Sequence, residues 1–328
     1  MKVVITGGTG FLGAALAHRL LERGTLTAPS GGEEPIDAIL LFDAAAPPEL
    51  SGLDDGRVEV RTGDVADRET VRGLVDRDDV SVFHLASIVS AGGERDFDGA
   101  LRVNLDGGRN VFEACRAREG RPRVVFASSF AAYGGSALPE TVTDTTKLTP
   151  QTTYGMTKAT CELLLNDYTR KGFLDGRAAR LPTVIIRPGK PNPAASAWAS
   201  GIFREPLAGQ ECILPVGLET RTPVSGHRTV VENLIRLHEA GGEALGDDRG
   251  LNFPSLSASA AEMQASLGRV ASDRTLGPIT VRPDPATEAI VNGWARYGSS
   301  ERADRLGFAR DADLDSIVRA YIEDFLPR

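Results

Sequence analysis

The sequence is poor in cysteine and histidine and has no excess of positive charge. Its 328 residues include three cysteines and four histidines, and Cys115, Cys161 and Cys212 lack the spacing of metal ligands. We therefore expect reduced thiols and no metal site. The formal net charge is −8, so no basic surface favours binding to nucleic acid or to an anionic membrane. Chemistry on a small molecule is the remaining expectation.

Long hydrophobic runs are missing as well. No apolar stretch approaches the length of a membrane span, and the first residues resemble a strand rather than the charged and apolar regions of a signal peptide. These features predict a cytoplasmic protein without membrane contact. Hydrophobic residues make up 41% and charged residues 25% of the chain, which is ordinary for a globular protein and excludes disordered and fibrous classes.

Short β-branched runs alternate with helical patterns through the first part of the chain. Predicted strands span residues 2–6, 38–42, 58–62, 80–85, 123–127 and 182–187, and predicted helices span residues 11–23, 68–75, 101–118 and 154–171. This alternation predicts an α/β fold with a doubly wound parallel sheet of the Rossmann type. Residues 124–126 and 184–186 are apolar throughout, as in a sheet covered on both faces. Residues 25–37 form a polar insertion rich in glycine and proline.

Three glycines, Gly7, Gly10 and Gly13, directly follow the first predicted strand and open the first predicted helix. Such a loop lets the backbone turn tightly and approach a pyrophosphate, whose charge then lies at the helix N-terminus. The chain contains 36 glycines, so a tight turn without a ligand is the alternative.

Two acidic residues follow the next predicted strands. Asp43 can accept hydrogen bonds from the ribose diol of an adenosine and would repel an additional 2′-phosphate, which favours NAD over NADP. The alternative for Asp43 is a solvated strand end. Asp64 lies where an adenine amino group would be, and the small residues of HLAS at 84–87 would let a cofactor pass close to the backbone. We interpret His84 itself as a packed strand-end side chain.

Tyr154 and Lys158 are four residues apart in a predicted helix and therefore lie on one face. A free tyrosine, with a pKa of about 10, is a poor base near neutral pH, and a neighbouring ammonium group lowers that pKa. Ser129 follows the fifth predicted strand, at the sheet edge where open α/β folds bind ligands. Its hydroxyl can hold the oxygen of an alcohol while hydride leaves the carbon. Each residue has a simpler alternative: Tyr154 can pack or cap, Lys158 can be a solvated charge and Ser129 a strand-end hydroxyl.

These segments resemble the extended short-chain dehydrogenase/reductase family, also described as NAD-dependent epimerases and dehydratases. The resemblance is carried by TGGTGFLG at 6–13, Asp64, HLAS, Asn104 in RVNLDGG, SSFAAYG, YGMTK and RPG at 187–189. It implies that NAD is the cofactor and that Ser129, Tyr154 and Lys158 form the catalytic set. The cofactor contacts expected on these grounds are Gly7, Gly10, Phe11, Leu12, Gly13, Asp43, Asp64, Val65, Leu85, Ala86, Asn104, Tyr154, Lys158 and Pro188. Phe130 and Ala131 stand where dehydratases of the family carry an Asp-Glu pair, which argues against dehydration of a sugar nucleotide.

The composition changes after Pro188, where proline, glycine and alanine dominate. We predict an NAD-binding Rossmann domain formed by residues 1–188 and about 226–249. A smaller mixed α/β lobe, formed by about 189–225 and 250–328, is predicted to bind the substrate.

Lys190 is one of five lysines in a chain rich in arginine, and it follows the sixth predicted strand. A cation at this junction would hold a substrate carboxylate, although an ordinary loop charge is the alternative. Arg204 is a further candidate for the anion. Asn192 and Ser196 are predicted to bind substrate hydroxyls, unless they only form turns.

The stretches 185–211, 250–270 and 282–308 resemble the D-erythronate dehydrogenase subgroup of this family, with RPGKPN at 187–192 as the matching motif. The resemblance implies NAD-dependent oxidation of the C2 hydroxyl of a four-carbon sugar acid, D-erythronate, to 2-dehydro-D-erythronate. Trp198 stands where a smaller aromatic residue is expected, which would change the size of substrate accepted. The alternatives are an NDP-sugar epimerase of the same family and a non-catalytic dinucleotide-binding sensor. The helices predicted at 101–118 and 154–171 resemble the pair through which family members form homodimers.

Overall fold

The computed structural model describes residues 1–28, 30–45, 52–191 and 194–326. Its centre is a parallel sheet of seven strands in the order β13-β9-β7-β6-β1-β4-β5. The strands are β1 (Lys2–Thr6), β4 (Ala38–Asp43), β5 (Val58–Thr62), β6 (Val80–His84), β7 (Arg123–Ser129), β9 (Asp175–Leu181) and β13 (Gly250–Asn252). The predicted doubly wound Rossmann fold is confirmed.

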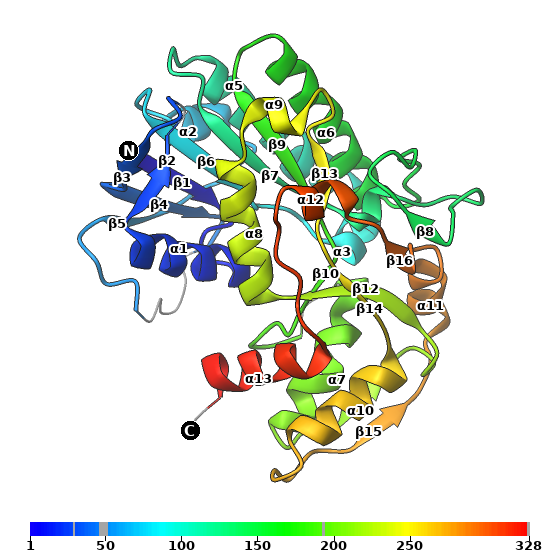
Figure 1. Cartoon of the computed structure of the whole chain (residues 1–328). Coiled ribbons are helices and arrows are strands. Elements are labelled where there is room, and N and C mark those ends of the chain that lie inside the picture. The colour runs from blue at the N-terminus through cyan, green and yellow to red at the C-terminus, as the bar shows by residue number, and fades with distance from the viewer. Residues whose placement is uncertain (29, 46–51, 192–193, 327–328) are drawn as a thin grey trace.

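Helices cover both faces of this sheet (Figure 1). Along β1, Val3 and Ile5 join one apolar cluster and Val4 joins the other, because alternate side chains of a strand point to opposite faces. The first cluster packs beneath α1 (Phe11–Arg23) and α8 (His227–Glu239). The second packs beneath α2 (Arg68–Arg72), α5 (Gly107–Arg116) and α6 (Thr153–Arg170). Two-sided burial explains why strands such as β1 are almost entirely apolar.

A second lobe lies beside the carboxyl ends of the strands (Figure 1). It contains a three-stranded sheet of β10 (Thr183–Ile185), β12 (Arg221–Gly226) and β14 (Leu256–Ser259). The helices α7 (Trp198–Leu207), α10 (Ala260–Val270) and α13 (Leu314–Phe325) bury a separate apolar core against it. Smaller elements complete the lobe and its links to the large sheet: β8 (Thr141–Val142), α9 (Gly242–Leu245), β11 (Cys212–Leu214), β15 (Ile279–Val281), α11 (Pro285–Val291), β16 (Tyr297–Gly298) and α12 (Glu301–Arg305).

The sixth strand of the large sheet is not the one predicted. The predicted range 182–187 does contain a strand, β10 (Thr183–Ile185), but its predicted place in the large sheet is wrong. The large sheet takes in β9 instead, Asp175–Leu181, whose sequence DGRAARL looks too polar for a buried strand. Its two arginines are buried but paired, Arg177 with Asp175 and Arg180 with Glu162. Pro182 has no amide hydrogen for a sheet ladder, and the chain then turns into β10 of the small sheet.

Three further segments differ from their predicted form. Part of the polar insertion at 25–37 forms an antiparallel hairpin of β2 (Thr25–Thr27) and β3 (Glu33–Pro35). The helix predicted at 68–75 stops at Arg72. The helix predicted at 101–118 starts earlier and is irregular: α3 (Ser90–Arg95) and α4 (Phe97–Ala100) precede a π-helical turn at Leu101–Asp106, which leads into α5.

Two strands belong to the sheet of the other predicted domain. β10 lies before residue 188 but belongs to the small sheet, and β13 lies after residue 249 but extends the large one. The limits at 188, 226 and 249 stay a prediction. Among the described residues, no helix is long and apolar enough to cross a membrane.

Candidate active site

A cavity of about 460 Å³ opens at the carboxyl ends of β1, β6 and β7, between the large sheet and the second lobe. Many of the residues predicted for the site line it: Gly7, Gly10, Phe11, Leu12, Gly13, Leu85, Ser129, Tyr154, Lys158, Ser196 and Arg204. The cavity therefore gathers the glycine loop, the predicted catalytic residues and part of the second lobe in one place.

The glycine loop is built for close approach. Gly7 has a φ of +70°, and a Cβ there would lie 2.8 Å from the backbone nitrogen of Ala86. A Cβ on Gly13 would overlap the carbonyl oxygen of Gly7. Helix α1 starts after Gly10 with no side-chain cap and no acidic residue in its first turn, so its free amide groups and positive dipole end are available to an anion. These features fit the pyrophosphate of NAD.

Asp43 ends β4 beside this loop and outside the cavity lining. Its carboxylate accepts hydrogen bonds from the Thr9 hydroxyl at 2.8 Å and from the Ala44 amide at 2.8 Å. The loop and the acid are thus held together, in the arrangement that the ribose of NAD requires. Contact between Asp43 and the cofactor stays a prediction.

Several of the other predicted cofactor contacts lie outside the cavity lining. Asp64 is exposed, accepts the Ala66 amide at 2.9 Å and pairs with Arg102; both contacts lower the pKa of its carboxyl group. Val65 is buried in the core beneath α5, and Pro188 is half-buried outside the cavity wall.

Asn104 holds a segment next to the cavity in place by hydrogen bonds. Its amide is buried, accepts a hydrogen bond from the Ile88 nitrogen at 2.7 Å and donates to the Ile88 oxygen at 3.0 Å. It also donates to the Thr157 hydroxyl at 3.3 Å. The segment after β6, which contains Leu85 and Ala86, is thereby fixed to α6. His84 is fully buried and bonds to the Thr6 hydroxyl at 2.6 Å, and burial lowers its pKa to about 3, so its interpretation as a packed residue is confirmed.

Strand β7 and helix α6 position the predicted catalytic residues. Ser129 is the last residue of β7, and Tyr154 and Lys158 occupy the first turns of α6. The helix is capped by Thr152, whose hydroxyl accepts the Gly155 amide at 3.1 Å. A Cβ on Gly155 would overlap the carbonyl oxygen of Ala131, two residues after Ser129. Glycine at 155 therefore lets the helix and the strand end meet.

The Ser129 side chain lies beside the Tyr154 hydroxyl. Burial raises the pKa of Tyr154, while Ser129 and the Arg187 guanidinium lower it. Lys158 is 2% exposed and, among the described residues, makes no ion pair or hydrogen bond. Its ammonium lies 5.4 Å from the centre of the Tyr154 ring, and burial lowers its pKa to about 8. The pair is placed as predicted, but the cation with a marked effect on the tyrosine pKa is Arg187.

Arg187 was not identified as a site residue from the sequence. It lines the cavity, is half-buried, and its guanidinium forms no ion pair or hydrogen bond with any described residue. Arg204 also lines the cavity but is paired with Glu205 at 2.5 Å and donates to the Arg187 carbonyl at 3.0 Å. Lys190, the predicted carboxylate ligand, is exposed and outside the cavity lining. The signal for Arg187 was present in the RPG motif, to which no separate role was given.

The remaining substrate predictions divide in a similar way. Ser196 lines the cavity, and Asn192 lies outside the described residues. Trp198 is 4% exposed and packs in the core of the second lobe rather than in the cavity wall. The tryptophan that does line the cavity is Trp294, for which no local sequence signal exists.

Comparisons with known proteins identify the family of the chain. The model of the "NAD dependent epimerase/dehydratase family" matches residues 3–224. A D-erythronate dehydrogenase of Cupriavidus necator is 48% identical over 99% of this chain and 98% of its own length, and one of Haemophilus influenzae is 39% identical over 98% and 99%. The crystal structure of a nucleoside-diphosphate-sugar epimerase from Agrobacterium tumefaciens superposes with a TM-score of 0.90 at 40% identity, covering 99% of this chain and 94% of that one.

The family match covers most of the chain, and the two curated relatives span nearly all of it. The chain belongs to the NAD dependent epimerase/dehydratase family of extended short-chain dehydrogenases/reductases, in which it groups with the D-erythronate dehydrogenases, and it is an NAD-dependent oxidoreductase.

Proposed function

We propose that the chain oxidises the C2 hydroxyl of a four-carbon sugar acid, D-erythronate, to give 2-dehydro-D-erythronate. The observation that carries this proposal is Arg187, whose guanidinium has no partner among the residues that the structure describes and lies in the wall of a cavity that also holds Tyr154. A half-buried arginine without a carboxylate partner is ready to receive one from a ligand, and its planar fork suits two-point binding of a carboxylate. The names of the two relatives support the same substrate.

The residues of the cavity can perform this oxidation. With the carboxylate on Arg187, the adjacent C2 hydroxyl would reach Ser129 and Tyr154, which line the same cavity. In its phenolate form, which is the minor form near neutral pH because burial raises the pKa of the phenol, Tyr154 takes the hydroxyl proton while Ser129 holds the oxygen. NAD supplies the acceptor for the hydride that leaves C2. Lys158 contributes a positive charge behind the tyrosine at pH values below its pKa of about 8.

The placement of the cofactor is part of the proposal. The glycine loop would bind the pyrophosphate and Asp43 the adenosine ribose, within residues 1–188 and about 226–249. We also propose a cytoplasmic location, since the three cysteines are free and buried as in a reduced protein.

An epimerase that acts on a nucleoside-diphosphate sugar is the second candidate. It is favoured by the name of the structure that superposes at 40% identity, and a pyrophosphate could occupy Arg187 and Arg204 in place of a carboxylate. An epimerase returns the hydride to its substrate and therefore forms no net NADH. A sensor without catalysis would bind NAD only.

The test is NADH absorbance with purified protein, NAD and a panel of D-erythronate, its C2 and C3 epimers, longer aldonates and UDP-sugars. We expect NADH from D-erythronate. Arg187→Met should raise KM for the acid by about 100-fold or more, because a charge-assisted bidentate contact is lost, and Tyr154→Phe should abolish turnover while NAD binding remains. Lys190→Met is the matched control and should change KM little. Interconversion of a UDP-sugar without NADH would contradict the proposal.

A further inference from the structure

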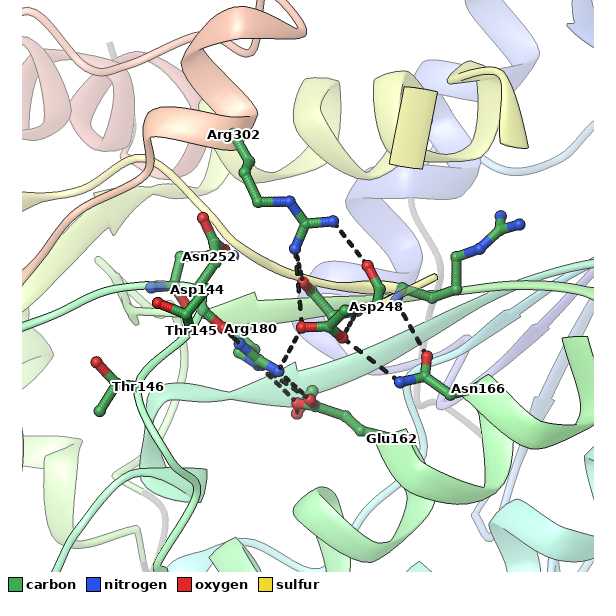
Figure 2. Close-up of polar contacts among 12 residues, drawn as sticks. Asp144, Thr145, Thr146, Glu162, Asn166, Arg180, Asp248, Asn252 and Arg302 are labelled. Carbon is green, nitrogen blue, oxygen red and sulfur yellow. Dashed lines mark hydrogen bonds and ion pairs between the residues drawn. The ribbon is translucent and has the colours of Figure 1, made fainter. Parts of the chain in front are cut away.

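A buried ion pair joins Glu162 on α6 to Arg180 on β9 (Figure 2). The Glu162 carboxylate accepts hydrogen bonds from Arg180 Nε at 2.9 Å and Nη2 at 2.7 Å, and the two side chains are only 3% and 4% exposed. Burying two charges is expensive, and an apolar pair of similar size is often as stable or more so. A role beyond stability would explain the pair.

The carboxylate joins the two elements that carry the catalytic residues. Glu162 lies on α6 one helical turn after Lys158. The hydroxyl of Ser128, the residue before Ser129 in β7, donates a hydrogen bond to the same carboxylate. Glu162 therefore links the strand end that holds Ser129 to the helix that holds Lys158.

Glu162 is also the anion that faces Lys158. The other titratable groups near the ammonium are Tyr154 and Cys161 on α6 and His84 on β6. Burial raises the pKa of the tyrosine, raises that of Cys161 to about 12 and lowers that of His84 to about 3, so near neutral pH these three groups are uncharged. Among the residues that the structure describes, Glu162 is thus the one negative neighbour of Lys158.

Arg180, which binds the Glu162 carboxylate, is held in place by hydrogen bonds of its own. Its Nη1 donates to the Tyr133 hydroxyl at 3.0 Å and to the Asp144 carbonyl at 2.9 Å. Asp248 approaches Arg180 from the surface at 3.8 Å, as Figure 2 shows. The pair is therefore held in place, and the charge that Lys158 experiences is that of Glu162 reduced by Arg180.

We propose that Glu162 is a positioning residue that keeps Lys158 charged and fixes Ser129, and that Arg180 tunes this effect. The inference rests on the proposed function for the roles of Ser129 and Lys158. It predicts opposite electrostatic consequences for the two partners. Removing the carboxylate makes the charged form of Lys158 less favourable, whereas removing the guanidinium makes it more favourable.

The experiment compares the pH dependence of kcat in Glu162→Gln and Arg180→Met. Wild-type activity should fall on the alkaline side as Lys158, with a pKa of about 8, loses its proton. In Glu162→Gln this alkaline fall should move to lower pH by about one unit, and in Arg180→Met to higher pH by a similar amount. A merely structural role lowers kcat in both variants without moving the profile. Unmoved profiles, or shifts in the same direction, would overturn the proposal.

Two additions keep the test decisive. If Glu162→Gln does not fold because Arg180 is left unpaired, the double variant takes its place, and its alkaline fall should lie below that of Arg180→Met alone. The profile is measured with whichever alcohol or nucleotide sugar of the panel wild type converts, so failure with sugar acids contradicts only the proposed function. The pH dependence of NAD affinity, measured by calorimetric titration, reports the same shift without turnover, and equal dependence in all variants would also contradict the proposal.

Discussion

Lys158 is a predicted catalytic residue whose burial is expected to lower the stability of the protein. Its ammonium is buried without an ion pair among the described residues, and burial lowers its pKa from 10.5 to about 8. Between these two pH values the unfolded chain binds the proton more strongly than the folded chain does. The free energy of unfolding therefore rises with pH in this window. Below pH 8 the buried ammonium destabilises the folded protein by its full amount.

Lys158→Met is accordingly expected to stabilise the protein while abolishing turnover. At pH 7 the gain should be up to about 3 kcal/mol, the equivalent of the lowered pKa, and it should shrink as the pH rises from 8 towards 10.5. Urea unfolding of both proteins at several pH values measures it. Lys147→Met is the control, because Lys147 is exposed and its replacement should change stability by less than about 0.5 kcal/mol. A destabilised Lys158→Met would contradict the argument.

For single residues, the sequence predicts those whose role depends on local geometry. It does not predict those whose role depends on the tertiary fold. The glycine loop, Ser129, Tyr154 and Lys158 follow from spacing along a strand and a helix, and the cavity contains them. The choice between Lys190 and Arg187 depends on how the chain turns after β10. Arg187 and Lys190 are close in the sequence, and only the fold determines which of the two side chains reaches the cavity.

The misplaced strand β9 shows the same limit for whole elements. Its polar sequence conceals a strand of the large sheet. Asp175 of the same strand pairs with Arg177, but the other partners of its arginines come from distant segments: Glu162 from α6, and the Leu237 and Ala240 carbonyls at the end of α8, which accept hydrogen bonds from Arg177. Apolar patterning predicts strands that are buried by default. It does not predict strands whose buried charges are satisfied elsewhere in the fold.

The segment after α11 divides the active-site cavity from a smaller one. Trp294 and Ala131 line both the main cavity and a second cavity of about 170 Å³, whose wall includes Glu94 and Gln151. The indole therefore stands at the boundary, where it would limit the length of a bound sugar acid.

Trp294→Ala should join the two cavities and favour longer substrates. We expect kcat/KM for five- and six-carbon aldonates to rise by about tenfold relative to D-erythronate, an effect of about 1.4 kcal/mol. Rates are compared well below the melting temperature, since removal of a packed tryptophan costs about 3 kcal/mol of stability or more. Trp294→Phe, which retains a ring at the boundary, should keep the wild-type preference. If both variants shift the ratio equally, Trp294 does not set substrate length.

Two large apolar side chains are exposed on helices that contact each other. Phe97 on α4 is 54% exposed and Leu163 on α6 is 69% exposed, and these two helices pack against each other. Large apolar side chains exposed together mark an interaction surface. Because a two-fold dimer uses the same patch on both subunits, a second copy of this chain is the partner we propose, in line with the homodimer expected from the sequence.

Disruption of this surface should therefore separate the subunits. Wild type should have the mass of a dimer by light scattering during gel filtration, whereas the variant with Phe97→Ser and Leu163→Glu should be monomeric at micromolar concentration, because a desolvated carboxylate would face its own symmetry mate. Ile213→Glu is the matched control, since Ile213 is 44% exposed on β11 of the other lobe. The proposed surface is wrong if wild type is monomeric, or if the control dissociates and the helix variant does not. The active-site cavity contains neither Phe97 nor Leu163 in its lining, so NADH formation by the monomer would show that each chain carries a complete site.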